Sequence, residues 1–145
     1  MKWFIGAIVG GATAGVLLLT GCAAGPDPAV GGQAAVTTPA AAPRSIPPQQ
    51  FAAAIAEPDR VTINVHVPFE GDLAGTDLSI PYDQIETQAN RLPAARDTPL
   101  AVYCMSGRMS LIAAEALSKL GYSDVVELDG GMVAWDGAGL PPAVR

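Results

Sequence analysis

The residue in this sequence best suited to chemistry is Cys104, which lies between a short apolar run and a helical pattern. The apolar run covers residues 100–103, and small or mixed residues follow the cysteine up to Met109. Residues 111–120 place apolar side chains at helical spacings and stop at Gly121, as helices with a C′ glycine do. A thiol in this position faces loop amides and a helix N-terminus, which stabilise an anion. The spacing therefore predicts a reactive thiolate.

The residues after the cysteine could hold an anion on the sulfur. Their backbone amides would surround it, and Gly107 allows the close approach of the backbone that such a loop needs. Arg108 would attract an anionic donor and help to keep Cys104 ionised. We therefore expect the substrate-binding part of the site to consist of Met105, Ser106, Gly107, Arg108 and Met109.

Two stretches of the sequence resemble the single-domain rhodaneses, a family of sulfurtransferases. The run from Tyr103 to Ser110 resembles the active-site loop of that family, and the run from Leu128 to Pro141, with its Gly-Gly-Met-x-x-Trp segment, resembles its C-terminal signature. The resemblance covers residues 46–143. It implies that Cys104 is the nucleophile and carries a sulfane sulfur as a persulfide. The donor would be thiosulfate or a polysulfide and the acceptor a thiol or cyanide, with no cofactor.

The sequence departs from the family pattern at two places. Many members carry arginine at the sixth loop position, where this chain has Met109, and its arginine is one residue earlier, at Arg108. Many also carry Asp-Val-Arg where this chain reads Asn64-Val65-His66. We list Asn64 and His66 as possible accessory residues, since a histidine replaces the arginine only when protonated. These departures weaken thiosulfate as the natural donor more than sulfur transfer itself.

Other functions compete with this interpretation. A non-enzymatic binding or redox-sensing module of the same fold is the main alternative, and Met109 favours it. A cysteine phosphatase needs an arginine six residues after the cysteine to bind phosphate in a bidentate manner, and that position is Ser110. No metal site is expected, because one histidine and one unpaired cysteine cannot close a zinc site.

The elements around the cysteine predict an α/β fold. Residues 61–65, 100–103 and 125–128 are expected to form strands, and residues 80–92 and 111–120 helices. A short helix capped by Ser45 should end by Pro58, and a turn at Gly130 and Gly131 should lead into a helix over residues 132–135. This alternation predicts a rhodanese-like, mostly parallel sheet with helices on both faces. Cys104 would lie at the carboxyl ends of the strands, where ligands bind in such sheets.

The N-terminal part reads as a leader and a linker. Residues 1–21 have a basic start and an apolar run, which predict a secretory signal peptide, and Leu19-Thr20-Gly21-Cys22 resembles the lipobox of bacterial lipoproteins. That resemblance implies a lipid on Cys22 and a membrane-anchored protein on the periplasmic or extracytoplasmic side. A permanent membrane-spanning anchor is the alternative. Residues 22–45, rich in Ala, Pro and Gly, are expected to be a linker, and residues 46–145 the folded domain.

Composition limits the partners further. The chain has 145 residues and a formal net charge of −6. Only two lysines occur, and there is no basic cluster, so a nucleic-acid partner is not expected. Small sulfur compounds and, through the lipid, a membrane are the partners that the sequence indicates. Nothing in it identifies a protein partner.

Overall fold

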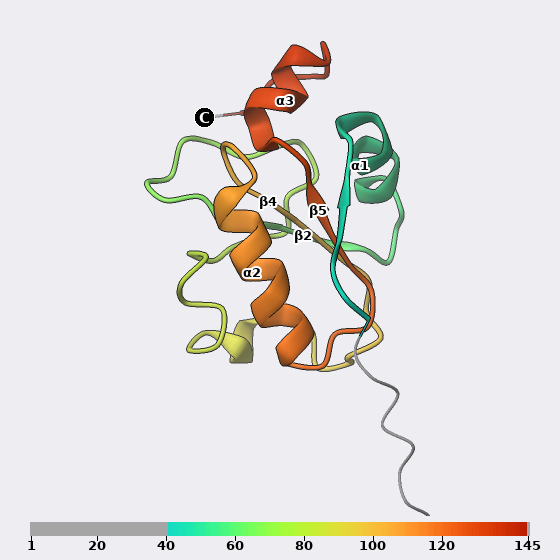
Figure 1. Ribbon diagram of the computed structural model, residues 1–145, viewed down its shortest axis with the longest axis vertical. Coiled ribbons are helices and arrows are strands. Elements are labelled where there is room, and N and C mark those ends of the chain that lie inside the picture. Colours follow the sequence, from blue (N-terminus) through green and yellow to red (C-terminus); the bar gives the residue numbers. More distant parts are fainter. Residues whose placement is uncertain (1–40, 145) are drawn as a thin grey trace, which may run out of the picture. The chain divides into compact units, whose positions relative to one another are not determined.

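The computed structural model describes residues 41–144, which contain a parallel β-sheet with helices on both faces (Figure 1). Within these residues five strands occur in the order β1-β5-β4-β2-β3, and every neighbouring pair is parallel. The strands are β1 (Arg44–Ile46), β2 (Val61–Asn64), β3 (Leu78–Ser79), β4 (Leu100–Tyr103) and β5 (Val125–Leu128). The predicted α/β class with a parallel sheet is confirmed.

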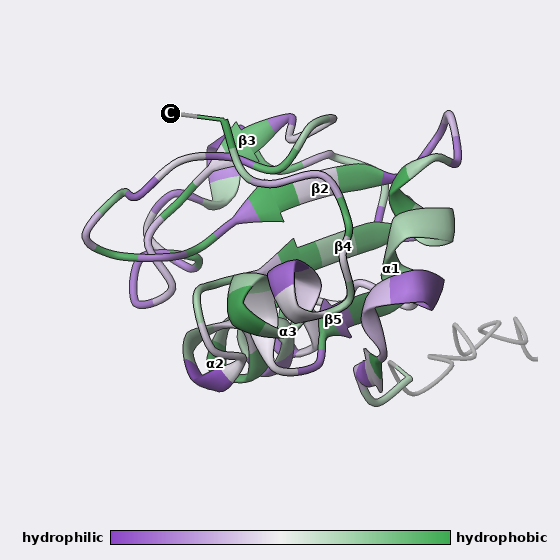
Figure 2. Cartoon of the chain, turned by 90° about the horizontal axis from the view of Figure 1, so that it is seen from above, coloured by the Kyte–Doolittle hydropathy of each residue, from purple (hydrophilic) through white to green (hydrophobic). Residues whose placement is uncertain are grey.

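Two apolar clusters cover the two faces of the sheet. One contains side chains of α2 (Arg108–Lys119) and of the segment over residues 80–92. The other contains side chains of α1 (Pro48–Ile55) and α3 (Gly131–Gly137). Figure 2 shows β2 and β4 as largely hydrophobic strands. Strands buried on both faces need continuous apolar runs, which explains why the sequence predicts these central strands well.

The predicted start of the folded part needs a correction. Ser45 does not cap a helix: it lies in β1, which pairs with β5 at the edge of the sheet. The first helix begins at Pro48, and Pro47 at its N-cap makes no side-chain hydrogen bond. Proline is well suited to the first helical position, because its missing N–H would have no partner there. β1 therefore includes Arg44 and Ser45, which the sequence assigned to the linker.

The helix predicted over residues 80–92 is wrong. This segment consists of turns and one 3-10 helix, η1 (Ala89–Arg91). Local hydrogen bonds such as Gln84 N–H to the Pro81 carbonyl, at 2.8 Å, replace a helical ladder. Ile85 is buried against the sheet in the cluster that contains α2. Packing of apolar side chains thus overrides the helical spacing, and turns satisfy the backbone.

The elements in the C-terminal half of the domain agree with the sequence, whereas the strand β3 was not predicted. Gly121 follows α2 with φ +98°, as expected for a residue that ends a helix. Trp135 packs the C-terminal helix α3 against Phe51, with ring centroids 6.3 Å apart. No helix within residues 41–144 is long and apolar enough to cross a membrane. The predicted signal peptide, Cys22 and most of the linker lie outside the described residues.

Candidate functional site

Cys104 lies directly after β4, in the middle of the sheet. β4 is paired with β5 on one side and β2 on the other, so Cys104 is at the carboxyl edge between two neighbouring strands. The loop then turns at Gly107, whose φ of +89° only glycine adopts readily, and α2 begins at Arg108. A side chain on Gly107 would also approach the backbone nitrogen of Gly130 to 3.1 Å. The local sequence thus folds into the predicted strand, loop and helix.

The sulfur of Cys104 receives hydrogen bonds from two backbone amides. The N–H of Gly107 donates to Sγ at 3.2 Å, and the N–H of Ser110 donates to it at 3.4 Å. Cys104 is a free thiol with 1% of its surface exposed. Amide donors directed at a buried sulfur stabilise a thiolate or a persulfide anion. The Gly107 amide belongs to the predicted binding loop, whereas that of Ser110 lies one residue beyond it.

A hydrogen-bonded chain connects the sulfur to the other side of β5. Sγ lies 3.5 Å from Oγ of Ser110, and this hydroxyl lies 2.9 Å from Oε2 of Glu127. The other carboxylate oxygen of Glu127 accepts a hydrogen bond from the Ser45 hydroxyl on β1. Sequence reasoning missed Ser110 and Glu127. A charged residue within the apolar run of a buried strand was the available signal.

The beginning of α3 holds the Cys104 loop from the side. The N–H of Met132 donates to the carbonyl of Cys104 at 2.9 Å, and the N–H of Val133 donates to that of Met105 at 3.0 Å. Gly131, with φ +61°, leaves no room for a side chain, since a Cβ would lie 2.4 Å from the Cys104 oxygen. The predicted glycine turn is therefore confirmed, and it also fixes the backbone of the Cys104 loop.

The two accessory candidates at the end of β2 organise a neighbouring loop. The amide of Asn64 donates to the Gly71 carbonyl and to Asp72, each at 2.9 Å, and its Oδ1 accepts from the N–H of His66. Nε2 of His66 lies 2.7 Å from a Glu70 oxygen. Because these bonds lead to residues 70–72 rather than to the sulfur, both residues act on the shape of the loop.

Tyr103 connects β4 to the same loop. Its hydroxyl accepts from the N–H of Leu73 at 2.9 Å, lies 2.6 Å from Oγ1 of Thr76 and donates weakly to Asp72 at 3.3 Å. Burial raises the pKa of Tyr103 to about 12, despite the hydrogen bond from Thr76 that favours the ionised form. The tyrosine therefore remains neutral throughout the physiological range and fixes the loop next to Cys104.

The charged and thioether side chains of the Cys104 loop point to different places. Arg108 is exposed and makes no hydrogen bond or ion pair with any residue in the described part of the chain. Met109 packs against the apolar cluster that contains α2. Met105 lines a hollow of about 300 Å³ together with Glu70, Met132, Asp136 and two C-terminal residues. The hollow that borders the loop is thus acidic and apolar, with no cation among its lining residues.

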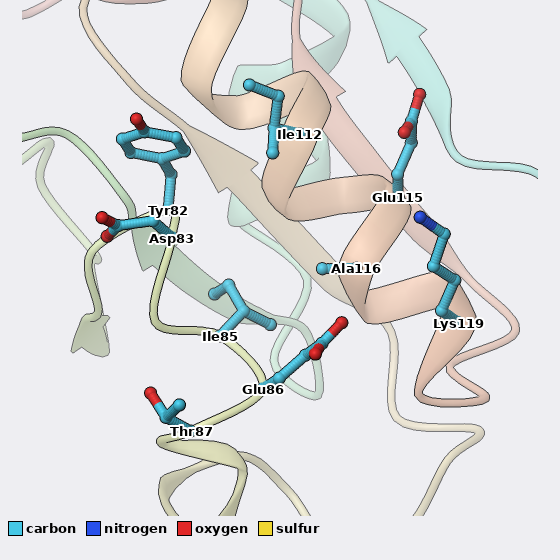
Figure 3. Close-up of a pocket in the computed structure, with 9 residues that line it drawn as sticks. All are labelled: Tyr82, Asp83, Ile85, Glu86, Thr87, Ile112, Glu115, Ala116 and Lys119. Atoms are coloured by element: carbon cyan, nitrogen blue, oxygen red, sulfur yellow. The ribbon is translucent and has the colours of Figure 1, made fainter.

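A second hollow of about 300 Å³ lies farther along α2 (Figure 3). It is bounded by α2 and by the segment over residues 82–87, and three carboxylates accompany Lys119 in its lining. The lining residues are Tyr82, Asp83, Ile85, Glu86, Thr87, Ile112, Glu115, Ala116 and Lys119. None of them belongs to the Cys104 loop, so this hollow is separate from the sulfur.

Fold and site together define a class of proteins: parallel α/β domains with a cysteine in an amide-lined loop at the end of a central strand. The family description that matches the chain is the rhodanese-like domain, over residues 62–138. The chain therefore belongs to the rhodanese-like domain family. A rhodanese-related protein from Thermoplasma volcanium is 32% identical, with a TM-score of 0.57, and the match covers 68% of this chain and 95% of that one.

Curated relatives carry sulfurtransferase names. A sulfurtransferase from Allochromatium vinosum is 38% identical over 64 residues, which are 44% of this chain and 58% of that protein. The thiosulfate sulfurtransferase GlpE from Pseudomonas fluorescens is 35% identical over 92 residues, which are 63% of this chain and 84% of that protein. The chain thus spans less than two thirds of the Allochromatium protein. These relatives support a sulfurtransferase-type role.

Proposed function

We propose that the protein is a sulfurtransferase that carries a sulfane sulfur as a persulfide on Cys104. The observation that carries this proposal is the pair of amides, from Gly107 and Ser110, that donate to Sγ. A persulfide needs such a site, since its terminal sulfur is a bulky anion that hydrogen-bond donors stabilise. The sulfurtransferase names of the relatives support the same reaction.

The reaction has two displacement steps. The Cys104 thiolate attacks the outer sulfur of a donor, an S–S bond forms, and the leaving group departs with the electron pair of the bond that breaks. With thiosulfate the leaving group is sulfite. A thiolate or cyanide then attacks the terminal sulfur, and Cys104 leaves as a thiolate. No electrons are gained or lost overall, so no redox cofactor is required.

The charges around the loop favour a donor of low charge. The hollow beside Met105 is lined by Glu70 and Asp136, both of which oppose a dianion such as thiosulfate. Arg108 lies at the start of α2 and is free to attract an anion from solvent, but Met109 supplies no second cation. We therefore propose an uncharged organic polysulfide or a monoanionic persulfide as the better donor, and a small thiol as the acceptor.

Uptake of sulfur tests the proposal directly. The reduced full-length protein is incubated with thiosulfate, which leaves as sulfite, or with an organic trisulfide, which loses one thiolate. Peptide mass spectrometry is expected to show on the peptide with Cys104 a gain of roughly 32 Da from thiosulfate, and from the trisulfide a gain of one sulfur plus the remaining thiol group of the donor. A thiol or cyanide should remove this mass. Cys104→Ser should abolish the adduct, and Cys22→Ser, the matched control, should leave it unchanged. A folded protein that takes up sulfur from neither donor would contradict the proposal.

Arg108 provides a second comparison. Arg108→Ala should slow uptake from thiosulfate more than uptake from the neutral trisulfide, because the arginine acts by charge attraction. Equal effects on both donors would show that Arg108 has no electrostatic role.

The second candidate function is a binding or redox-sensing module of the same fold. The methionine at position 109, where many members of the family have arginine, favours it. A sensor would take up no sulfur in the experiment above, but would form a reversible oxidation product on Cys104.

We also propose that the protein is exported and anchored to a membrane through a lipid on Cys22. The lipobox-like residues 19–22 after an apolar run support this location. A soluble linker would then keep the rhodanese domain at a distance from the membrane surface, on the periplasmic or extracytoplasmic side.

A further inference from the structure

Glu127 is a buried carboxylate that lies beneath the Cys104 loop. It has 1% of its surface exposed, and its side chain is on the face of β5 that packs against α2. The hydroxyls of Ser45 and Ser110 each donate a hydrogen bond to one of its two carboxylate oxygens. No cation within residues 41–144 forms an ion pair with Glu127. Burying a carboxylate without a cation is costly, and the two serine hydroxyls are the groups that offset this cost.

The hydroxyl of Ser110 lies within hydrogen-bonding distance of more acceptor groups than its single proton can satisfy. It lies 2.8 Å from the Gly107 carbonyl, 2.9 Å from Oε2 of Glu127 and 3.5 Å from the Cys104 sulfur. A serine has one proton to donate. While Cys104 is a thiol, its S–H donates to Oγ and Ser110 donates to the carboxylate. Once Cys104 is a thiolate, sulfur and carboxylate both require the same serine proton.

We propose that Glu127 receives the proton of Cys104 through Ser110. The S–H bond breaks and its proton forms a bond to Oγ of Ser110, while the serine's own proton passes to Oε2 of Glu127. The neutral acid then donates to Ser110, and Ser110 donates to the thiolate, so that every group again has a partner. No proton leaves the site in this step. Glu127 acts through Ser110 and is thus a positioning residue.

The use of this transfer in catalysis rests on the proposed function. The thiolate formed in this way is the species that attacks a sulfur donor. When the persulfide has passed its outer sulfur to an acceptor, Cys104 leaves as a thiolate and the proton returns from Glu127 along the same path. Within residues 41–144 no carboxylate or imidazole makes a hydrogen bond to the sulfur directly, so the path through Ser110 leads to Glu127.

The other charged groups near the hydrogen bonds between Cys104, Ser110 and Glu127 are exposed to solvent or form ion pairs with one another. Arg44 on β1 pairs with Asp124 at 3.0 Å, and His66 pairs with Glu70 at the end of β2. The charged residues on α2 are all exposed, as is the acid that follows β5; they are Arg108, Glu115, Lys119 and Asp129. α1 carries no charged side chain, and β4 faces β5 with apolar residues. Glu127 is therefore the buried acidic group that can exchange a proton with Cys104 through Ser110.

The pH dependence of alkylation tests the proposal. Iodoacetamide is neutral and reacts with the thiolate, and the rate for Cys104 is followed by mass spectrometry of its peptide in the full-length protein. A single uncoupled thiol gives a rate that rises about tenfold per pH unit up to one plateau. Two groups that share a proton give two steps, with a pH-independent interval between them. We expect this interval in the wild-type protein.

Three variants test which side chains produce the pH-independent interval. Glu127→Gln keeps the shape of the side chain but accepts no proton, and should restore the single tenfold-per-unit rise. Ser110→Ala should narrow the flat interval, since the shared hydrogen bonds are lost. Ser45→Ala, the matched control, removes the other hydroxyl on Glu127 and should keep the interval. Circular dichroism verifies folding, and Glu127→Met replaces Glu127→Gln if the latter is unfolded.

The alkylation experiment tests the proton transfer independently of the sulfurtransferase function. A wild-type profile with one step, or a flat interval that persists in Glu127→Gln, would overturn the proposal. An interval lost in Ser45→Ala but kept in Ser110→Ala would also overturn it. Alkylation needs no sulfur donor, so a two-step profile in a protein that takes up no sulfur would support the coupling while it contradicts the sulfurtransferase function.

Discussion

Gly131 offers the sharpest test of how the Cys104 loop is held. Its φ of +61° is unfavourable for any residue with a side chain, and an added Cβ would lie 2.4 Å from the Cys104 oxygen. That distance is about 1 Å shorter than ordinary van der Waals contact. Gly131→Ala should therefore displace the backbone of Cys104 as well as strain its own. The two costs add, because they arise from different atoms.

A second glycine separates these two costs. Gly139 has φ +71°, close to that of Gly131, yet nothing lies within 4 Å of an added Cβ. Gly139→Ala should lower the free energy of unfolding by about 1–2 kcal/mol, the cost of a left-handed backbone alone. Gly131→Ala should cost about 1–3 kcal/mol more, as overpacked sites do.

Urea denaturation followed by circular dichroism measures the difference. With a slope of about 1–3 kcal/mol per molar urea, the midpoint of Gly131→Ala should fall clearly below that of Gly139→Ala. Sulfur uptake on Cys104 should also fall in Gly131→Ala only, in conditions where both variants are folded. Equal midpoints for the two variants would refute the contact between the glycine turn and the Cys104 loop.

Three further predictions concern ionisation and export. The pKa of Tyr103 is raised to about 12 in the folded protein, so its phenol ionises first in the unfolded state and the free energy of unfolding falls as the pH rises above 10. The difference in free energy of unfolding between wild type and Tyr103→Phe should therefore shrink by about 1 kcal/mol from pH 9 to pH 11 in denaturant titrations. Burial would raise the pKa of Asp124, but hydrogen bonds from Arg44 and Arg60 lower it overall. The free energy of unfolding should thus fall as the pH falls through that pKa. The variant Asp124→Asn should lose less stability than wild type in acid, in the same assay. Intact mass of the native protein should show a chain that begins at a lipid-modified Cys22, and a mass that retains Met1 would contradict this.

The central part of the fold could be predicted because its signals are local. β4 is an apolar run that is followed by Cys104, and β5 is a mostly apolar run that is followed shortly by a pair of glycines. α2 has apolar residues at helical spacing and a glycine just after its end. Such patterns depend on burial of contiguous residues, which a sequence displays directly.

The edges could not be predicted, because their structure depends on distant partners. β1 and β3 have three and two residues, and neither stands out by composition. Their backbone groups pair with β5 and β2, so these strands exist only once the centre of the sheet is present. The segment over residues 80–92 likewise follows the sheet surface instead of its own helical spacing.

The candidate site shows the same division between local and distant information. The loop from Cys104 to Arg108 was visible as a motif, and the amide of Gly107 lies where that motif places it. The contacts that hold the loop come from residues distant in the sequence, namely Met132 and Val133 at the start of α3 and Glu127 on β5. A sequence motif identifies the sulfur, but the groups that set its protonation are brought by the neighbouring strand.

This arrangement changes how the departures from the family pattern are understood. Met109 stands at the loop position where many members of the family have arginine, and Glu127 places a carboxylate two hydrogen bonds away from the sulfur. Both features oppose a dianionic donor approaching Cys104. A proton taken up by Glu127 offsets that charge at the moment the thiolate forms. The buried glutamate and the missing arginine are thus compatible with one chemistry: transfer of sulfur from donors that carry little charge.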